Sequence, residues 1–126
     1  MTTRGIRGAI TIASDSEENV LSATGELLEV ILDANPELKT DDIGSVFFTV
    51  TEDIVSAYPA LVARQMGWTL VPMICAREIP VPESMPFCIR VLIQWNTELA
   101  QEKIKHIYLK GAKDLRPDLV DNPKEK

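Results

Sequence analysis

The residue that most suggests chemistry is Arg90, because it lies inside an otherwise apolar run, FCIRVLIQWN, at residues 87–96. β-Branched, aliphatic and aromatic residues in such a run are typical of a buried strand. Arginine keeps its charge, and an unpaired charge in a dry sheet is very costly. Arg90 is therefore expected to form a buried ion pair, to reach solvent at a strand end, or to act as a fixed cation that stabilises negative charge on a reacting molecule.

Four other residues carry groups that could act with this arginine: Arg7, Cys75, Glu78 and Tyr108. Each also has an ordinary interpretation, as a surface strand charge, a small half-buried thiol, a solvated loop acid and an amphipathic strand residue. Cys75 and Glu78 are three residues apart, so in a regular strand they face opposite sides. They would share a site only where the chain twists or bulges.

Composition excludes several classes of function. The formal net charge of −6 argues against a nucleic-acid partner, which needs a basic face. One histidine and two cysteines without a CxxC pair predict neither a metal site nor a disulfide framework. No histidine–serine pair and no glycine-rich phosphate loop is recognisable. With no apolar run of membrane-spanning length and no secretory signal at the N-terminus, the expected location is the cytoplasm.

The elements that must position these residues alternate between strand and helix patterns, and they predict one α+β domain with a mixed sheet. The domain is expected to cover residues 1–119, with a flexible tail at 120–126. Three prolines make residues 79–86 an extended or turning loop. The strands are expected at residues 5–12, 45–51, 68–75, 88–96 and 106–109, the main helices at 14–34 and from Pro59 to Gly67, and a brief helix at 110–115.

The strand at residues 88–96 has two different faces. Ile89, Val91, Ile93 and Trp95 share one face, and the other carries Arg90. Cys88 and Leu92 also lie on the Arg90 side, so both faces are partly apolar. Two helices can cover only one of them. A partner subunit is therefore expected on the face with Arg90, which predicts a homo-oligomer.

Short motifs in a fixed order connect these observations to a known family. They are RGIRGA at 4–9, YPA at 58–60, GW and VP within 67–72, C-x-x-E at 75–78, CIRV at 88–91, H-x-YL at 106–109 and LRPDL at 115–119. In their joint order and spacing the chain resembles the monofunctional, homotrimeric AroH-type chorismate mutases over residues 3–119. The resemblance implies a Bacillus-type chorismate mutase fold, with about five strands packed by two main helices, and a trimer with a barrel-like centre.

The implied activity is that of an isomerase, the rearrangement of chorismate to prephenate in phenylalanine and tyrosine biosynthesis. This Claisen-type reaction is unimolecular, so the resemblance implies no cofactor and no metal. It also implies active sites between adjacent subunits, with chorismate as the small-molecule partner.

The resemblance also implies roles for individual residues. Arg90 would lie beside the ether oxygen and a carboxylate of the substrate, and Arg7 would bind the enolpyruvyl carboxylate with help from Tyr108. Glu78 would accept a hydrogen bond from the ring hydroxyl as an ionised positioning group, with Cys75 beside it. The other implied substrate-binding residues are Tyr58, Ala60, Arg64, Ile74, Leu115 and Arg116, the last two in a closing C-terminal segment.

One position departs from the family pattern, and two other functions stay open. Leu61 stands where some relatives carry a lysine near the pocket mouth, so no cation is expected there. A non-catalytic trimeric module that binds a dicarboxylate would use the same arginines. An enzyme of unrelated class on a similar α+β scaffold is the third possibility, because fold does not determine function.

Overall fold

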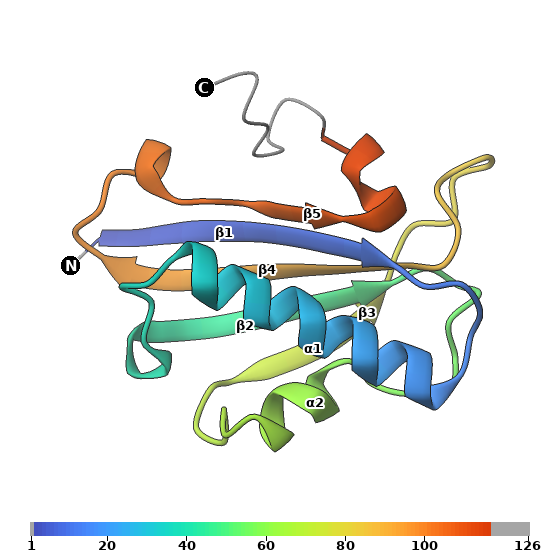
Figure 1. Ribbon diagram of the computed structural model, residues 1–126, viewed down its shortest axis with the longest axis horizontal. Helices are drawn as coiled ribbons and strands as arrows, with labels where there is room; N and C mark the ends of the chain where they lie inside the picture. The colour runs from blue at the N-terminus through green and yellow to red at the C-terminus, as the bar shows by residue number, and fades with distance from the viewer. Residues whose placement is uncertain (1, 117–126) are drawn as a thin grey trace.

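The computed structural model describes residues 2–116 and forms one five-stranded sheet with helices packed on it (Figure 1). The elements in chain order are β1 (Thr2–Thr11), α1 (Glu17–Ala34), η1 (Thr40–Asp42), β2 (Ile43–Val50), α2 (Ala60–Gln65), β3 (Met73–Arg77), β4 (Cys88–Thr97), η2 (Gln101–Lys103), β5 (Ile107–Leu109) and η3 (Lys110–Asp114). The strand order is β3-β2-β4-β1-β5. β4 is antiparallel to β1 and β2, whereas β1–β5 and β2–β3 are parallel pairs. The predicted α+β fold with a mixed sheet is confirmed.

α1 ends at Ala34 as predicted, but it begins at Glu17, three residues later than predicted. The Ser16 hydroxyl caps its first turn by accepting a hydrogen bond from the Asn19 N–H at 3.0 Å. At its other end the helix stops before Asn35-Pro36. The buried Asn35 side chain donates to the Ile31 carbonyl at 2.9 Å and to the Lys105 carbonyl at 3.1 Å, and it accepts from the Lys105 N–H at 3.0 Å. The end of α1 is thereby joined to the segment that leads into β5.

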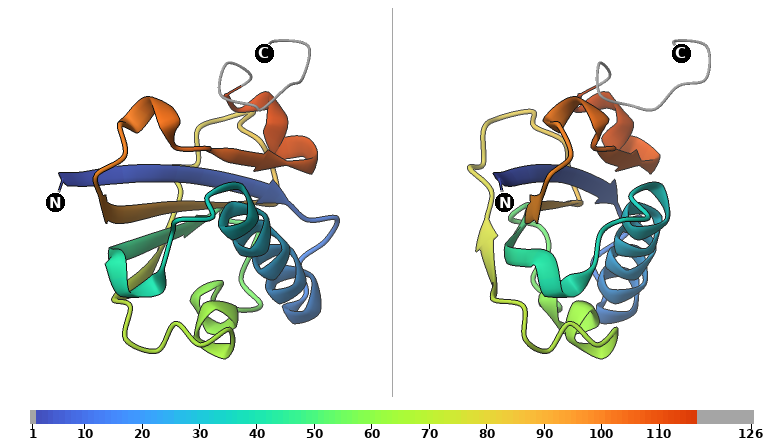
Figure 2. Two further views of the ribbon diagram at one scale, coloured as in Figure 1. Left: turned by 60° about the vertical axis from the view of Figure 1, so that its left-hand side comes forward. Right: turned by 90° about the vertical axis from the view of Figure 1, so that its left-hand side faces the viewer.

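Both α1 and α2 lie on one side of the sheet, and the main core fills the space between them and the strands (Figure 2). On β4 the core residues are Ile89, Val91, Ile93 and Trp95, each 4% exposed or less. The predicted alternation of this strand is therefore correct. Arg90 lies on the opposite side, called here the outer face of the sheet.

The predicted strand at residues 68–75 is wrong in its bounds, because β3 covers Met73–Arg77. The end of α2 explains the difference. Gly67, at a φ of 98°, ends the helix as predicted, and the Trp68 N–H donates to the Ala63 carbonyl at 3.1 Å. The Trp68 ring enters the core at 2% exposure, so residues 68–72 form a turn rather than a strand. Pro72 precedes β3 and accepts from the Val46 N–H through its carbonyl at 2.9 Å.

The outer face of the sheet is left open within this chain. Ile74, Phe47 and Leu92 are neighbours across β3, β2 and β4, and they are 58%, 37% and 39% exposed. A smaller cluster of Ala9, Cys88, Tyr108 and Ala112 covers the part of this face near β5. An apolar row of this kind in the middle of a sheet is typical of an interface.

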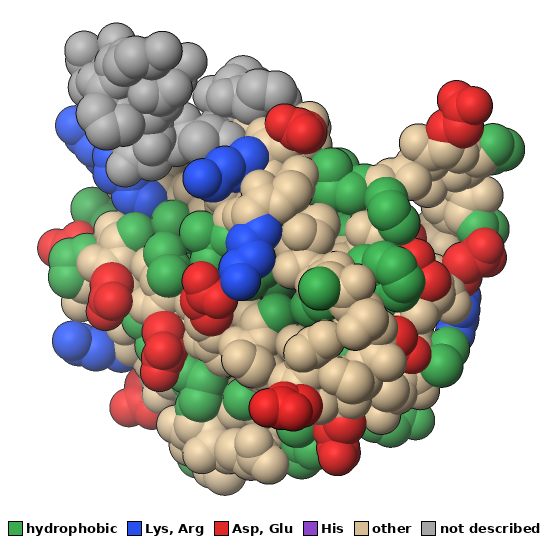
Figure 3. Space-filling model, turned by 45° about the vertical axis from the view of Figure 1, so that its right-hand side comes forward, with side chains coloured by type: hydrophobic (Ala, Val, Ile, Leu, Met, Phe, Trp, Pro, Cys, Tyr) green, Lys and Arg blue, Asp and Glu red, His purple; other side chains and the backbone are tan. Residues whose placement is uncertain are grey.

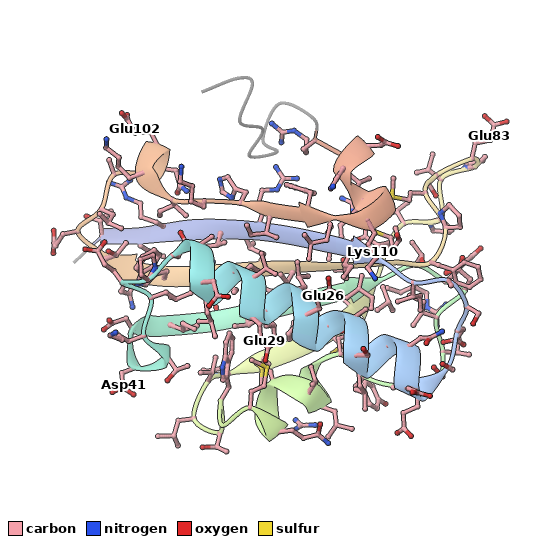
Figure 4. The ribbon with its side chains drawn as sticks, viewed as in Figure 1. Glu26, Glu29, Asp41, Glu83, Glu102 and Lys110 are labelled. Atoms are coloured by element: carbon pink, nitrogen blue, oxygen red, sulfur yellow. The ribbon has the colours of Figure 1, made fainter. Side chains whose placement is uncertain are left out.

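The proline-rich loop between β3 and β4 projects from one edge of the sheet and carries Glu83 at its tip (Figures 1 and 4). On the face drawn in Figure 3 the acidic side chains are spread in separate groups. Among residues 2–116, no helix has the length and apolar character needed to cross a bilayer. The expected tail at 120–126 and the domain limit at residue 119 lie outside the described residues.

Candidate active site

Arg90 projects from the middle of the sheet into a cavity on the outer face. Its direct neighbours in register are Ala9 on β1 and Thr49 on β2, and Tyr108 of β5 lies beyond Ala9. The small side chain of Ala9 is fully buried and packs with Cys88 and Tyr108. The cavity has a volume of about 520 Å³ and is lined by Arg7, Gly8, Phe47, Thr49, Arg90, Val91, Leu92, Tyr108, Leu115 and Arg116.

Glu78 contacts this group from the start of the proline-rich loop. Its N–H donates to the Val50 carbonyl at 2.8 Å, which continues the β2–β3 pairing by one residue. Its carboxylate accepts a hydrogen bond from the Thr49 hydroxyl, and its Oε2 lies 3.6 Å from Nε of Arg90. Thr49 was not predicted as a site residue. The alternation of Phe47 and Thr49 on the outer face of β2 is the signal that could have found it.

The Nε group of Arg90 is buried and has no hydrogen-bond partner within residues 2–116. The 3.6 Å separation from Glu78 is an ion-pair contact, too long for a hydrogen bond. The whole side chain is nevertheless 41% exposed, because the rest of the guanidinium faces the cavity. A buried, charged donor without an acceptor is costly, and an anion in the cavity would supply the acceptor.

Arg7 is held by the single histidine of the chain. The Arg7 N–H donates to Nδ1 of His106 at 2.9 Å, next to the first β1–β5 pair, Gly8 with Ile107. Burial, with Arg7 and Arg116 as nearby positive charges, lowers the pKa of His106 below its ordinary value of 6.5. The neutral ring, with its proton on Nε2, is the form that accepts this bond.

Tyr108 and Leu115 close the cavity on the β5 side. Tyr108 is 5% exposed and packs with Cys88 and Ala112, and Leu115 packs against the same cluster. Burial raises the pKa of the Cys88 thiol, and the nearby Arg90 opposes this shift only in part. A neutral Cys88 thiol, two residues before Arg90 on the same face of β4, adds no negative charge beside the guanidinium.

The C-terminal side of the cavity is connected to the helix layer. η3 begins at Lys110, whose Nζ lies 3.7 Å from Oε1 of Glu26 on α1. Figure 4 shows these two side chains close together between η3 and α1. Both are about half exposed, so this ion pair orients the segment before Leu115 and adds little stability.

The other predicted site residues lie elsewhere on the same chain. Tyr58, 72% exposed, and Cys75 line a second cavity of about 490 Å³ together with Leu61. Ala60 is buried at the start of α2, and Arg64 is exposed in its last turn. Ile74 belongs to the apolar row of the outer face. Within one chain the predicted residues are therefore divided: one set lines the cavity around Arg90, whereas Tyr58 and Cys75 line another, and Glu78 lines a third, beside the proline-rich loop.

Asp15 fixes the segment that precedes Tyr58, a role that the sequence did not reveal. Its carboxylate accepts hydrogen bonds from the Val55 N–H at 3.1 Å, the Ser56 N–H at 3.3 Å and the Ser56 hydroxyl at 2.6 Å. The Ser56 hydroxyl and these backbone groups lower the pKa of Asp15. Within residues 2–116, no group of three or more His, Cys, Asp or Glu side chains is placed to hold a metal ion.

Comparison with known proteins places this architecture in a family. The family model described as chorismate mutase type I matches residues 3–119. A curated relative, chorismate mutase AroH of Thermus thermophilus, is 52% identical over 116 residues, which cover 92% of this chain and 95% of the relative. Chorismate mutase AroH of Bacillus subtilis (strain 168) is 39% identical over 120 residues, 94% of each chain.

A solved structure, a chorismate mutase from Clostridium thermocellum, superimposes with a TM-score of 0.85. It is 44% identical in sequence, and the match covers 87% of this chain and 97% of that one. The fold and the sequence thus lead to the same assignment. The chain belongs to the type I chorismate mutase family.

Proposed function

We propose that this chorismate mutase converts chorismate to prephenate in the outer-face cavity, with Arg90 as the cation next to the bond that breaks. The rearrangement needs the flexible dianion to be held in a compact conformer in which the reacting carbons meet. Orientation of this kind is worth up to about 7–11 kcal/mol in favourable intramolecular reactions. A preorganised donor at a developing oxyanion adds about 3–4 kcal/mol.

The observation that carries the proposal is the buried Nε of Arg90, which has no hydrogen-bond acceptor among residues 2–116. As the C–O bond lengthens, negative charge gathers on the ether oxygen, and a fixed N–H donor stabilises that charge. Glu78 limits the rotation of the guanidinium through its 3.6 Å contact, and Thr49 in turn orients Glu78. Because the rearrangement transfers no proton, Glu78 acts as an ionised acceptor for the ring hydroxyl.

The remaining cavity residues bind the two carboxylates and enclose the substrate. Arg7 and Tyr108 face the same cavity as Arg90, which suits them to the enolpyruvyl carboxylate. Leu115 and Arg116 lie at its C-terminal rim, where a closing segment would cover the substrate. Arg64, exposed on α2, would attract the dianion toward the entrance.

We further propose a cytoplasmic homotrimer in which each site combines two chains. The support is that predicted site residues line separate cavities of one chain, some around Arg90 and others around Tyr58 and Cys75. The exposed row of Ile74, Phe47 and Leu92 supplies an apolar surface for the contact. The domain is assigned to residues 1–119, with 120–126 as a tail outside it.

The test follows chorismate loss and prephenate appearance with the purified protein, its Arg90→Ala and Arg90→Lys variants, and Arg4→Ala as a control. Arg90→Ala is expected to lower kcat by about 100- to 1,000-fold. Arg90→Lys retains the charge and part of the activity, because lysine lacks the two-pronged geometry. Arg4, whose Nε donates to the Leu99 carbonyl at 3.1 Å, carries the same charge outside the cavity, so its loss leaves kcat unchanged.

Unchanged turnover in Arg90→Ala would contradict the assigned role. Chorismate binding without any turnover by the unmodified protein would instead favour a binding module that holds dicarboxylates.

A further inference from the structure

The start of β4 is held in an unusual backbone conformation, three residues before Arg90. Phe87 has a φ of 50°, a left-handed value that residues with a side chain rarely adopt. Its N–H donates to both carboxylate oxygens of Asp53, at 3.0 and 3.2 Å. Its carbonyl accepts from the Ile12 N–H at 2.9 Å, just past the end of β1. Phe87 thus joins the ends of three segments at one point.

Thr51 completes this junction. Its backbone N–H donates to the Cys88 carbonyl at 3.1 Å, and its hydroxyl accepts from the Cys88 N–H at 3.0 Å. The same hydroxyl hydrogen-bonds to the Asp53 carboxylate. The β2–β4 ladder, whose last pair is Val50 with Ile89, is therefore extended by side chains that fix two further N–H groups.

The other end of the proline-rich loop is attached to the same place. The Glu78 N–H donates to the Val50 carbonyl at 2.8 Å, so the loop leaves and returns at residues 50–53. In Figure 1 the loop projects from the edge where β3 ends and β4 begins. Glu78 stands at the start of the loop, and Arg90 lies in β4 shortly after its end. Oε2 of Glu78 and Nε of Arg90 are 3.6 Å apart.

We propose that Asp53 is a positioning residue for the rearrangement, acting through the left-handed conformation of Phe87 to set where Arg90 and Glu78 lie relative to each other. This inference rests on the proposed function, since it concerns the placement of the cation that acts on the substrate. Asp53 itself lines a third cavity, between residues 51–53 and the proline-rich loop, together with Thr51 and Glu78. It does not line the cavity that contains Arg90.

Removal of the carboxylate frees the Phe87 N–H and removes the acceptor that holds φ at 50°. The backbone then relaxes toward negative φ, which is the lower-energy region for phenylalanine. Such a change at the first residue before β4 rotates the start of the strand and displaces Arg90. Displacements of about 1 Å at a reacting group lower rates by about 100-fold.

The experiment compares kcat, KM and thermal midpoint for Asp53→Ala, Asp53→Asn, Phe87→Gly, the double variant Asp53→Ala/Phe87→Gly, and Glu52→Ala. Asp53→Ala is expected to lower kcat by about 10- to 100-fold with a smaller change in KM, because the cation acts mainly in the transition state. Asp53→Asn keeps an acceptor oxygen and most of kcat. Glycine adopts a φ of 50° without help, so the double variant recovers kcat although its thermal midpoint stays low.

Glu52→Ala is the matched control, since it removes the same charge from an exposed neighbour and is expected to leave kcat unchanged. An equal loss of kcat in Asp53→Ala and in the double variant would overturn the inference, as would unchanged kcat in Asp53→Ala. Either result would contradict only the positioning role of Asp53 and would leave the proposed function in place. Absence of turnover in the unmodified protein would instead overturn the proposed function.

Discussion

Arg90 is tolerated in an apolar strand because its neighbours are small or polar. Ala9 and Thr49 flank it in register, and Glu78 supplies a partial counter-charge at 3.6 Å. The sequence around Arg90 predicted an ion pair, an arginine that reaches solvent at a strand end, or a functional cation. The structure shows an ion-pair contact with Glu78 in the middle of β4 and leaves the catalytic role as a proposal. The pair with Glu78 is incomplete, since Nε has no hydrogen-bond acceptor among the described residues. We regard this incomplete pairing as the feature that suits the residue to an anionic ligand.

At the same scale, His106 is expected to make both stability and activity sensitive to acid. Its pKa is lowered in the folded state by burial, Arg7 and Arg116, so between 6.5 and that lower value the unfolded chain binds more protons. The contribution of His106 to the free energy of unfolding is therefore fully present above pH 6.5, and it is lost as the pH falls through the pKa of the folded state. Protonation of Nδ1 also removes the acceptor for the Arg7 N–H, so kcat/KM should fall in the same window.

Because the chain has one histidine, NMR titration of its ring protons measures this pKa directly. His106→Asn keeps a polar side chain that cannot titrate and should flatten the pH dependence of the thermal midpoint. A ring that titrates at 6.5 or above would contradict the expectation.

At the scale of elements, α1 packs closely against β1, the strand that carries Arg7 and pairs with the strand of Arg90. Gly8 makes this approach possible. A Cβ at this position would lie 2.9 Å from Cδ1 of Ile31, 3.1 Å from Cγ1 of Val91 and 3.3 Å from the backbone oxygen of Ile107. The second glycine of the RGIRGA motif, Gly8, is thus explained by packing between helix and sheet.

Gly8→Ala is accordingly expected to lower the free energy of unfolding by about 1–3 kcal/mol, the usual cost of overpacking. It should also lower activity, because β5 cannot move away from β1 without carrying Tyr108 with it. Gly5→Ala is the control on the same strand: its Cβ would meet only Cδ1 of Leu92, at an ordinary 3.5 Å. Chemical denaturation of both variants checks the difference, and equal stability of the two would contradict it.

The elements themselves were largely predictable from sequence. Helix caps such as Ser16 and the alternation along β4 are local signals, and they predicted α1 and the buried face correctly. The error at residues 68–72 arose because Trp68 satisfies a strand pattern equally well, although tertiary packing places its ring in the core. The roles of Asp15 and Asp53 depend on contacts between segments far apart in sequence, which no local pattern reports.

At the scale of the molecule, one chain presents two separate cavities that contain predicted site residues. Arg7, Arg90 and Arg116 line one of them, whereas Tyr58 and Cys75 line the other. The family resemblance assigned Tyr58, Cys75 and Arg90 to one site. Their spacing along the chain could not show that they line different cavities of the same chain. Association of chains through the outer face would bring complementary halves together.

Dissociation of the proposed trimer is therefore expected to abolish activity. A dilution series that measures kcat per chain beside mass by light scattering should show both falling over the same concentration range. Leu92→Glu places a charge in the exposed apolar row and should shift this range to higher concentration. A monomer with full activity would contradict the shared site.

β4 is paired along its length with β1 and, over most of it, with β2. Amide protons in a strand bordered on both sides exchange only when the whole domain opens. Arg90 therefore belongs to the region of the chain that is expected to unfold last. Partial fraying of the sheet edges leaves its guanidinium in place, so thermal inactivation of the individual chain should coincide with complete unfolding.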